Sequence, residues 1–345
     1  SLGPRRVIGL GGVLLGIGIM ATSQISAQWQ LYFFYGLVAA LGMSTAYIPC
    51  NMTVVRWFHE KRGLALGVAS CGASCGILVM PMLASYIIEH AGWRTGLLVL
   101  GAGLFIVINI AAHFMVRSPE VLGLSPDGAT ASPSSGVPDA VAGADDLPGW
   151  TLIEARATIT LWMFLFAFAI VLLTVTVPFV HIPNFARDIG LSATGGAFAI
   201  SITGLFALLG SITLGALSDR IGRKRAMVFA LCLQVAAFLI FLGADSAAAL
   251  YFGAAAFGFF YGGIASLFPA FVGDLFGREH AGAIGGFIFG GAGILGAWGP
   301  AVAGYLRDTE GDYRFPFTLC ALSALCALLL FLFLPGPRSQ SRSRP

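Results

Sequence analysis

Residues 158–180 read TITLWMFLFAFAIVLLTVTVPFV, a stretch of 23 residues without a charged side chain. The hydrocarbon core of a bilayer is about 30 Å thick, so an α-helix needs about 20 apolar residues to cross it. This stretch is long enough for one crossing and apolar enough to prefer lipid to water. It therefore predicts a membrane-spanning helix.

Nine further stretches of this kind appear when the chain is cut at its charged and Gly/Pro/Asn/Asp-rich breaks. Composition agrees, because 57% of the 345 residues are hydrophobic and 10% are charged, whereas about a quarter are charged in soluble proteins. The sequence predicts an all-α multi-pass membrane protein with ten spans, near residues 7–26, 31–55, 63–87, 96–116, 158–180, 195–217, 226–243, 247–271, 281–304 and 315–334.

Lysine and arginine are retained on the cytoplasmic side of short loops, which gives the expected orientation. With the N-terminus inside, fifteen of the 19 basic residues fall inside and four outside, namely Arg94, Arg187, Arg307 and Arg314. We expect both ends in the cytoplasm and a plasma membrane, taken to be a bacterial inner membrane. The net charge of +3 is small and sorted by loop, so no nucleic-acid partner is expected.

Residues 118–149 differ in composition, being rich in Ala, Gly, Ser, Pro and Asp and lacking any basic residue. Such a segment buries too little apolar surface to fold alone. We expect a flexible cytoplasmic linker over residues 117–157, between an N-terminal bundle over residues 1–116 and a C-terminal bundle over residues 158–334. Residues 335–345 would form a cytoplasmic tail.

The two halves match each other at one ungapped offset of 219 residues, as duplicated transporter bundles do. The same offset places the start of the first half about 60 residues before Ser1, which leaves room for two more spans. We therefore number the ten spans three to twelve, and an upstream reading frame without two apolar spans would contradict this. The matched pairs are Gly3/Gly222, Arg6/Arg225, Glu60/Glu279, Gly63/Gly282, Gly67/Gly286, Gly72/Gly291 and Pro81/Pro300.

The strongest local motif, between predicted spans eight and nine, is GALSDRIGRKR, Gly215 to Arg225. A carboxylate in a short turn can meet the positive end of a helix dipole, while basic residues hold the loop at an anionic membrane surface. The motif resembles the G-x-L-x-D-R-x-G-R-K/R-R loop of the major facilitator superfamily, whose fold has two six-helix bundles. Leu2 to Arg6 is similar to a truncated first copy of it.

This resemblance implies a conformational latch in which Asp219 engages a helix end, at the start of span five near Gly63 or at the start of span eleven. The alternative is a positive-inside loop without a latch. The residues assigned to the latch loop are Asp219, Arg220, Gly222, Arg223, Lys224 and Arg225, with Gly3, Arg5 and Arg6 in the first copy.

Four further segments together resemble the monocarboxylate and oxalate/formate antiporter branch: RWFHEKRGLALG (56–67), GWR (92–94), RSPEVLGL (117–124) and HIPNFARDIG (181–190). They indicate fold and branch rather than substrate. Carboxylate transporters of the branch carry an arginine within span eight, and the equivalent position here is Ser211. No Lys, Arg, Asp or Glu lies well inside any predicted span, so a cation in a missing first span would be needed to restore the countercharge.

The resemblance also implies which polar residues line a substrate cavity. For any single Ser or Thr, a hydroxyl bonded to its own helix is the more common arrangement. His181, expected at a helix end, could carry a proton or bind a carboxylate, or it could be a water-exposed interfacial residue. The cavity candidates are Tyr47, Asn51, Ser70, Ser74, Thr174, Thr176, His181, Ser201, Thr203, Ser211, Tyr261 and Trp298.

Small residues recur on one face of spans five and eleven, at Gly63 and Gly67 and at Gly282, Gly286 and Gly290. We expect them to let backbones approach closely, although a glycine-rich composition alone would also place them there. Pro81 and Pro300, at equivalent positions, would kink the two spans where neighbouring groups satisfy the freed carbonyls.

The sequence thus favours a secondary transporter that moves a small organic solute, such as a monocarboxylate, by alternating access. Its expected partners are the solute, the bilayer and a coupling proton or ion, and we expect a monomer. The alternatives are an efflux-type transporter for an uncharged or hydrophobic solute and a transporter-derived sensor. No catalytic constellation, P-loop or cofactor motif appears, so an enzyme is not expected. Cys71 and Cys75 lie one turn apart without a nearby His or acid, so packing is favoured over metal binding.

Overall fold

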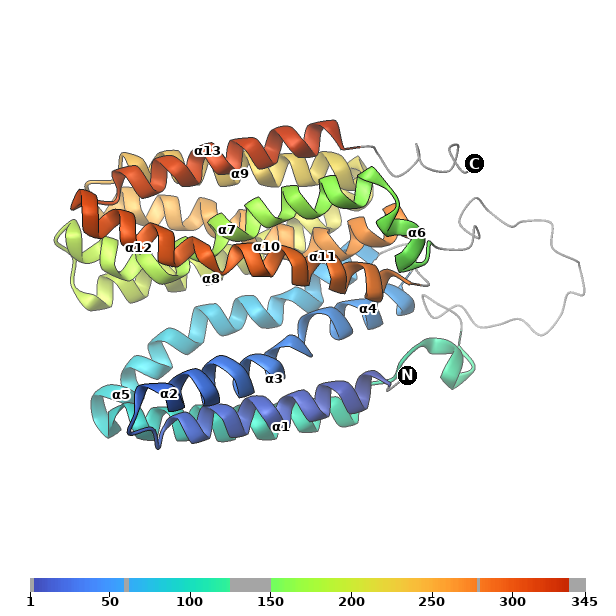
Figure 1. Cartoon of the computed structure of the whole chain (residues 1–345), viewed down its shortest axis with the longest axis horizontal. Coiled ribbons are helices and arrows are strands. Elements are labelled where there is room, and N and C mark those ends of the chain that lie inside the picture. The colour runs from blue at the N-terminus through green and yellow to red at the C-terminus, as the bar shows by residue number, and fades with distance from the viewer. Residues whose placement is uncertain (1–2, 59–61, 125–149, 278–279, 335–345) are drawn as a thin grey trace, which may run out of the picture. The chain divides into compact units, whose positions relative to one another are not determined.

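The computed structural model describes residues 3–58, 62–124, 150–277 and 280–334. Within these ranges ten helices are long and apolar enough to cross a membrane, and each overlaps one predicted span. The matched pair Glu60/Glu279, the centre of the predicted linker and the tail lie outside the described residues. The all-α multi-pass architecture predicted from the apolar stretches is confirmed (Figure 1).

The chain divides into two compact units, which we call the N-terminal unit (Ser1–Glu60 and Met82–Ala142) and the C-terminal unit (Lys61–Pro81 and Gly143–Pro345). The division differs from the predicted bundles in one respect, because residues 61–81 of span five group with the second half of the chain. One helix, α5 (Arg62–His113), therefore belongs to both units, passing from one to the other after Pro81.

The N-terminal unit contains α1, a broken fourth span and the second half of α5. Close glycine contacts hold α1 against α5, since a Cβ built on Gly16 would lie 3.1 Å from the carbonyl oxygen of Gly101. Span four is divided because Pro49 has no N–H to offer the carbonyl of Thr45, where one segment ends and the next begins. The segments are α1 (Pro4–Thr22), α2 (Gln28–Leu31), a π-helical stretch (Tyr32–Ala39), α3 (Ala40–Ser44) and α4 (Tyr47–Trp57).

Spans five and six are continuous in α5 except at Gly92, whose φ of 78° and ψ of 160° break the helix. A positive φ is accessible to glycine at little cost, so Gly92 marks the turn between the two spans. Beyond α5 a short 3₁₀ turn, Pro119–Leu122, begins the segment that was predicted as linker.

Among the described residues the C-terminal unit holds the first part of α5, the short α6 and the helices α7 to α13, and α7 to α13 run alongside one another in Figure 1. Phenylalanines fill its interior, and Phe168 stacks on Phe268 with ring centroids 4.2 Å apart. In a bilayer such rings stabilise helix packing through van der Waals contact with one another. The helices are α6 (Leu152–Arg156), α7 (Ile159–Asp188), α8 (Ala193–Ile221), α9 (Arg223–Leu242), α10 (Ala247–Phe276), α11 (Ala281–Gly296), α12 (Trp298–Glu310) and α13 (Arg314–Phe333).

Two helices of this unit differ from expectation near prolines. Span seven continues to Asp188, eight residues beyond its predicted end, and stops where Gly190 adopts a φ of 83°. The bonds Leu191 N to Ala186 O (2.8 Å) and Gly190 N to Arg187 O (2.9 Å) form the usual glycine-terminated helix end. Span eleven is divided at Ala297 into α11 and α12, three residues before Pro300.

Candidate functional site

The turn between α8 and α9 is set by Gly222, the one residue between the two helices, which has a φ of 90°. This conformation is rarely open to residues with a Cβ. The turn brings the last turn of α8 and the first turn of α9 side by side. As a result, Arg223 Nη2 lies 2.5 Å from Asp219 Oδ1.

Asp219 also reaches the start of span five. Its Oδ2 accepts a hydrogen bond of 3.2 Å from the backbone N–H of Leu64. Leu64 lies in the first turn of α5, where backbone N–H groups have no partner within the helix and carry the positive end of the helix dipole. This is one of the two helix ends that sequence reasoning named for Asp219, the one near Gly63.

Arg223 extends the cluster to α10. Its Nε lies 3.4 Å from Asp274 Oδ2, and the two side chains are 10% and 21% exposed. The guanidinium also donates to Ser218, which in turn donates to the carbonyl of Gly215 at 2.6 Å. Sequence reasoning missed Asp274, because the repeat offset places it opposite a valine, Val55, and no motif includes it.

The other basic residues of the loop have different positions. Lys224 Nζ donates to the carbonyl oxygens of Leu332 at 2.8 Å and Leu334 at 2.6 Å, and so caps the end of α13. The loop therefore binds neighbouring helix ends through Asp219 and Lys224. Two further basic residues, Arg220 and Arg225, lie at the surface.

The truncated first copy lies in the N-terminal unit and makes different contacts. The carbonyl of Gly3 accepts from the N–H groups of Arg6 and Val7 and so begins α1. The side chain of Arg5 lies 2.7 Å from His113 Nδ1, at the end of α5. Arg6 is exposed.

Seven of the cavity candidates in the C-terminal unit are buried, with at most 7% of each exposed: Ser70, Ser74, Thr174, His181, Ser201, Thr203 and Ser211. Most of the hydroxyls bond to a carbonyl of their own helix, for example Thr203 to Ala199 O at 3.1 Å and Ser211 to Leu208 O at 2.9 Å. Ser70 Oγ is buried without a hydrogen-bond partner in the described part of the chain.

The remaining candidates are dispersed. Tyr47 and Asn51 belong to the N-terminal unit, where the Asn51 amide donates to the carbonyl of Tyr47 at 3.0 Å. Tyr261 packs edge-on against Phe179, with centroids 4.9 Å apart. Trp298, at the start of α12, is 64% exposed. These four residues lie on three different helices, α4, α10 and α12.

Two hydroxyls reach a neighbouring helix, and that of Thr176 also lies 3.3 Å from the carbonyl oxygens of Leu172 and Leu173 on its own helix. Ser201 donates to the carbonyl of Leu78 on α5 at 3.2 Å, and Thr176 donates to the carbonyl of Gly296 at 3.1 Å. The second bond has a clear origin, because Pro300 lacks the N–H that would bind the carbonyl four residues earlier. The side chain of Thr176 on α7 satisfies that freed carbonyl at the break in span eleven.

Replacing Thr176 by valine should destabilise the C-terminal unit by about 1 kcal/mol, since it removes one interhelical hydrogen bond of the kind worth about 0.6–1.7 kcal/mol in membranes. Valine has nearly the same shape as threonine, so the packing of α7 against its neighbours should be kept. The measurement is unfolding in mixed micelles. Thr213→Val is the matched control, because the Thr213 hydroxyl bonds Leu209 O of its own helix at an exposed position. Equal losses in the two variants would contradict this account.

His181 is neither at a helix end nor exposed to water, so both expectations for its placement were wrong. It lies seven residues before the end of α7, because the helix continues through Pro183, and it is 6% exposed. Its Nε2 lies 2.9 Å from the carbonyl oxygen of Pro300, and its Nδ1 lies 3.0 Å from the Tyr313 hydroxyl.

Close packing is found at one of the two expected glycine faces. A Cβ on Gly67 would lie 2.4 Å from the carbonyl oxygen of Ser211, so α5 and α8 touch through their backbones. A Cβ on Gly286 or Gly290 would meet nothing within 4 Å, so span eleven makes no close contact at these two positions. It packs closely at another glycine, because a Cβ on Gly299 would lie 2.0 Å from the carbonyl oxygen of Leu173 on α7. Ser211, where the branch has arginine, is fully buried in the α5–α8 contact with Cys71 Sγ 3.6 Å from its hydroxyl.

An apolar groove of about 160 Å³ lies between α7, α12 and α13. Its walls include Leu173, Val177, Val302, Leu306, Pro316 and Leu319, with the Thr174 hydroxyl beside them. The groove can offer apolar contact but no countercharge to a carboxylate. Among the described residues, no group of three or more His, Cys, Asp or Glu side chains could hold a metal ion.

Comparison with known proteins gives consistent matches. The sequence profile of the Major Facilitator Superfamily matches residues 1–185 and again residues 164–345. Monocarboxylate transporter 12-B of Danio rerio is 27% identical over 363 residues, covering 96% of this chain and 72% of its own length. Monocarboxylate transporter 13 of Rattus norvegicus is 27% identical over 354 residues, covering 100% of this chain and 77% of its own.

Solved structures show the same fold. The E. coli fucose:proton symporter superposes with a TM-score of 0.67 at 16% identity, over 96% of this chain and 84% of that one. The human organic anion transporter TETRAN superposes with a TM-score of 0.70 at 17% identity, over 96% and 78% of the two chains. At this identity the likeness concerns the fold alone.

The spans, the doubled profile match and these superpositions define an all-α membrane transporter rather than an enzyme. The chain belongs to the Major Facilitator Superfamily. Its resemblance to the monocarboxylate branch, inferred from four short segments, is confirmed by relatives along nearly the whole chain. Those relatives are from vertebrates, so the expected bacterial inner membrane receives no support from them.

Proposed function

We propose that this transporter moves a small organic anion of the monocarboxylate class across the plasma membrane by alternating access. The supporting observation is the 27% identity, over nearly all of the chain, to relatives named for monocarboxylates. Its partners would be the solute, the bilayer and a coupling proton or ion, with the protein acting as a monomer.

The proposed orientation has both termini in the cytoplasm, because the loops rich in Lys and Arg are retained there. The contact of Asp219 with Leu64 then lies on the cytoplasmic side. The Asp188–Arg307 pair, with Arg307 Nη2 3.0 Å from Asp188 Oδ1, lies on the extracellular side.

Asp219 would act as the latch of the transport cycle. Its carboxylate joins α8 to the first turn of α5, the helix that continues into the N-terminal unit. A bond at this place favours one conformational state, and breaking it is part of the change to the other.

A second candidate solute is uncharged. The observation that favours it is Ser211, because this position holds a buried hydroxyl rather than the arginine of the branch. A small carboxylate would find no cation there, and a neutral polar solute would need none.

The test is solute counterflow in proteoliposomes that contain the purified protein. Each labelled monocarboxylate is paired with its neutral amide, for example lactate with lactamide, so that charge differs while size and shape are kept. Exchange of the acids alone supports the proposal, and exchange of the amides alone supports the uncharged solute. Binding of either without exchange would overturn transport in favour of a sensor.

A further inference from the structure

The groove between α7, α12 and α13 is hollow because both outer helices are held against α7 while small side chains line the space between them. A Cβ on Gly299 of α12 would lie 2.0 Å from the carbonyl oxygen of Leu173, so α12 touches α7 through its backbone. Phe317 of α13 packs edge-on against Phe185 of α7, with ring centroids 5.1 Å apart. The small residues in the walls are Gly299, Ala303, Cys320 and Ser323.

The groove opens beside an apolar stripe on α13. Phe315, Leu319 and Leu322 follow one another at intervals of four and three residues, so they share one helix face, and all three are exposed. Leu319 of this stripe is also part of the groove wall, as is the exposed Val302 of α12. Exposed apolar side chains on a membrane-spanning helix contact lipid chains. The groove is therefore open to hydrocarbon rather than to water.

The size of the groove selects its occupant. Its volume is about 160 Å³, and an apolar cavity of about 150 Å³ takes up a single benzene molecule. A helix, about 10 Å across, does not fit. The walls run over residues 299–306 of α12 and 316–323 of α13, about 10 Å at 1.5 Å per residue, which is less than half of the hydrocarbon thickness of about 30 Å. One acyl chain of one leaflet matches these dimensions.

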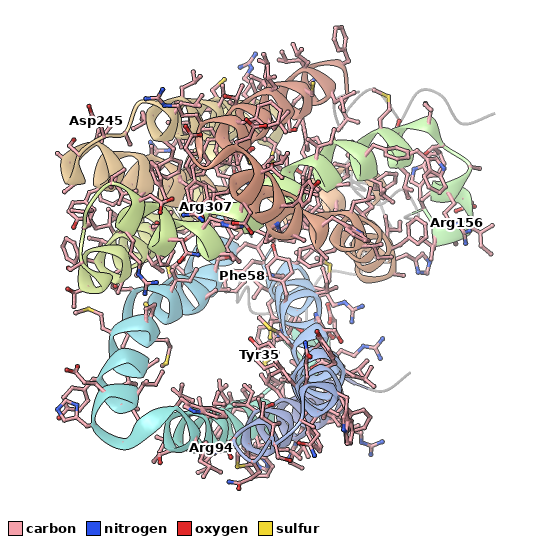
Figure 2. All side chains as sticks on the ribbon, turned by 60° about the vertical axis from the view of Figure 1, so that its left-hand side comes forward. Tyr35, Phe58, Arg94, Arg156, Asp245 and Arg307 are labelled. Atoms are coloured by element: carbon pink, nitrogen blue, oxygen red, sulfur yellow. The ribbon has the colours of Figure 1, made fainter. Side chains whose placement is uncertain are left out.

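A cation lies at the outer end of the groove. Arg314 begins α13, two residues before Pro316, and is exposed. Its backbone N–H donates to Asp312 Oδ1 at 2.9 Å, but in the described part of the chain its guanidinium has no hydrogen-bond or ion-pair partner. Arg307, which is labelled in Figure 2, pairs instead with Asp188 at 3.0 Å. Arg314 is thus available to a phosphate group, with which arginine forms strong hydrogen bonds.

The other charges at this end favour a zwitterionic headgroup over an anionic one. Three cations and four carboxylates lie at the adjoining ends of the three helices, so the region has no excess of positive charge to attract an anionic lipid. A headgroup that carries both a phosphate and an ammonium group can meet both signs of charge. The charged residues are Arg187, Asp188, Arg307, Asp308, Glu310, Asp312 and Arg314.

We propose that the groove binds one acyl chain of a zwitterionic phospholipid, such as a phosphatidylcholine, whose phosphate pairs with Arg314. The chain enters past Leu319 and lies against the floor formed by Thr174 and Val177. Van der Waals contact with the apolar walls holds it there, as such contact holds helices together in a bilayer. In the proposed orientation the turn between α12 and α13 is extracellular, so the lipid belongs to the outer leaflet.

The first experiment counts the lipids on the intact protein. The purified protein in detergent micelles is titrated with dioleoyl phosphatidylcholine, and native mass spectrometry counts the lipids that each protein molecule retains. We expect one lipid to bind about tenfold more tightly than any further one. Dioleoylglycerol, which has the same chains without the phosphate, should bind about threefold more weakly. The anionic dioleoyl phosphatidylglycerol should bind no more tightly than the phosphatidylcholine.

Each of these comparisons can overturn the inference. Equal binding of dioleoylglycerol would contradict the pairing of a phosphate with Arg314, and tighter binding of phosphatidylglycerol would contradict the preference for a zwitterion. A series of lipids of equal affinity would mean that no single site exists. Protein dimers without lipid would show instead that a second copy of the chain covers the groove.

Two variants locate the site. Arg314→Gln should weaken the first lipid about threefold, and Arg187→Gln is its control, because Arg187 is exposed at the same end of the unit but lies outside the groove. Ala303→Leu fills the groove and should weaken the first lipid about tenfold. Its control is Ala301→Leu, at an exposed position on the same helix outside the groove wall. Unchanged binding in Arg314→Gln or in Ala303→Leu would contradict the proposed site.

A labelling experiment on the wild type does not depend on how well the variants fold. A phosphatidylcholine that carries a diazirine in the middle of one acyl chain is irradiated with the protein in nanodiscs, and the labelled peptides are sequenced. We expect most of the label on residues 299–306 and 316–323, and excess dioleoyl phosphatidylcholine should remove it. Label spread evenly over the exposed apolar residues of the chain would show surrounding bilayer lipid only and would overturn the inference.

Discussion

Asp219→Ala should reduce solute exchange at least tenfold while leaving a folded, monodisperse protein. The substitution removes the acceptor for the Leu64 N–H and the carboxylate that holds Arg223. A hydrogen bond to a charged group contributes about 1.5–3 kcal/mol, and the 19% exposure of Asp219 places this one toward the lower end. A loss of about 1.4 kcal/mol from one conformational state corresponds to a tenfold change in population.

The measurement is the initial rate of counterflow at equal protein density. Asp219→Asn should lie between wild type and Asp219→Ala, because the amide oxygen still accepts from Leu64 but the charge is lost. Asp245→Asn, in the exposed turn between α9 and α10, is the control and should leave exchange unchanged. If Asp219→Ala exchanged solute within twofold of wild type, the latch would have no role in the cycle.

The contact of Asp219 with the start of α5 could be predicted from the sequence because two separate patterns indicate it. The loop motif supplies the carboxylate, and the 219-residue offset supplies the equivalent helix starts at Gly63 and Gly282. Asp274 had no such signal, because its role depends on where α10 ends relative to Arg223. A tertiary contact of this kind depends on how the helices pack, so no fixed spacing of residues in the sequence indicates it.

The environment of His181 was mispredicted for a related reason. Span seven was predicted to end near residue 180, but in a membrane helix the neighbouring groups can satisfy the backbone at a proline, and the helix continues through Pro183. The longer helix therefore places three residues on one helical face rather than in a loop, namely Asn184, Arg187 and Asp188. Burial of the imidazole followed from that longer helix and from Tyr313, whose position after α12 no local pattern could indicate.

Close helix packing could also be predicted only in part. The 46 glycines of the chain indicate that helices pack closely, but not at which positions. The structure separates them by what a side chain would meet. At Gly262 on α10 a Cβ would lie 1.7 Å from the carbonyl oxygen of Ala207 on α8. At Gly286 on α11 it would meet nothing within 4 Å. The two positions look alike in sequence and differ completely in space.

Gly262→Ala should therefore destabilise the C-terminal unit by about 3 kcal/mol, the upper part of the usual cost of overpacking, because the obstacle is backbone rather than a movable side chain. The helices α8 and α10 would have to separate along their whole contact, which also loosens the phenylalanine core beside them. The measurement is reversible unfolding in mixed micelles, with the yield of monodisperse protein as a second readout. Gly286→Ala is the matched control and should gain up to about 1 kcal/mol from helix propensity. If both substitutions gave the same stability, the direct backbone contact of α8 with α10 would be contradicted, and with it the packing that holds the candidate site of this unit in place.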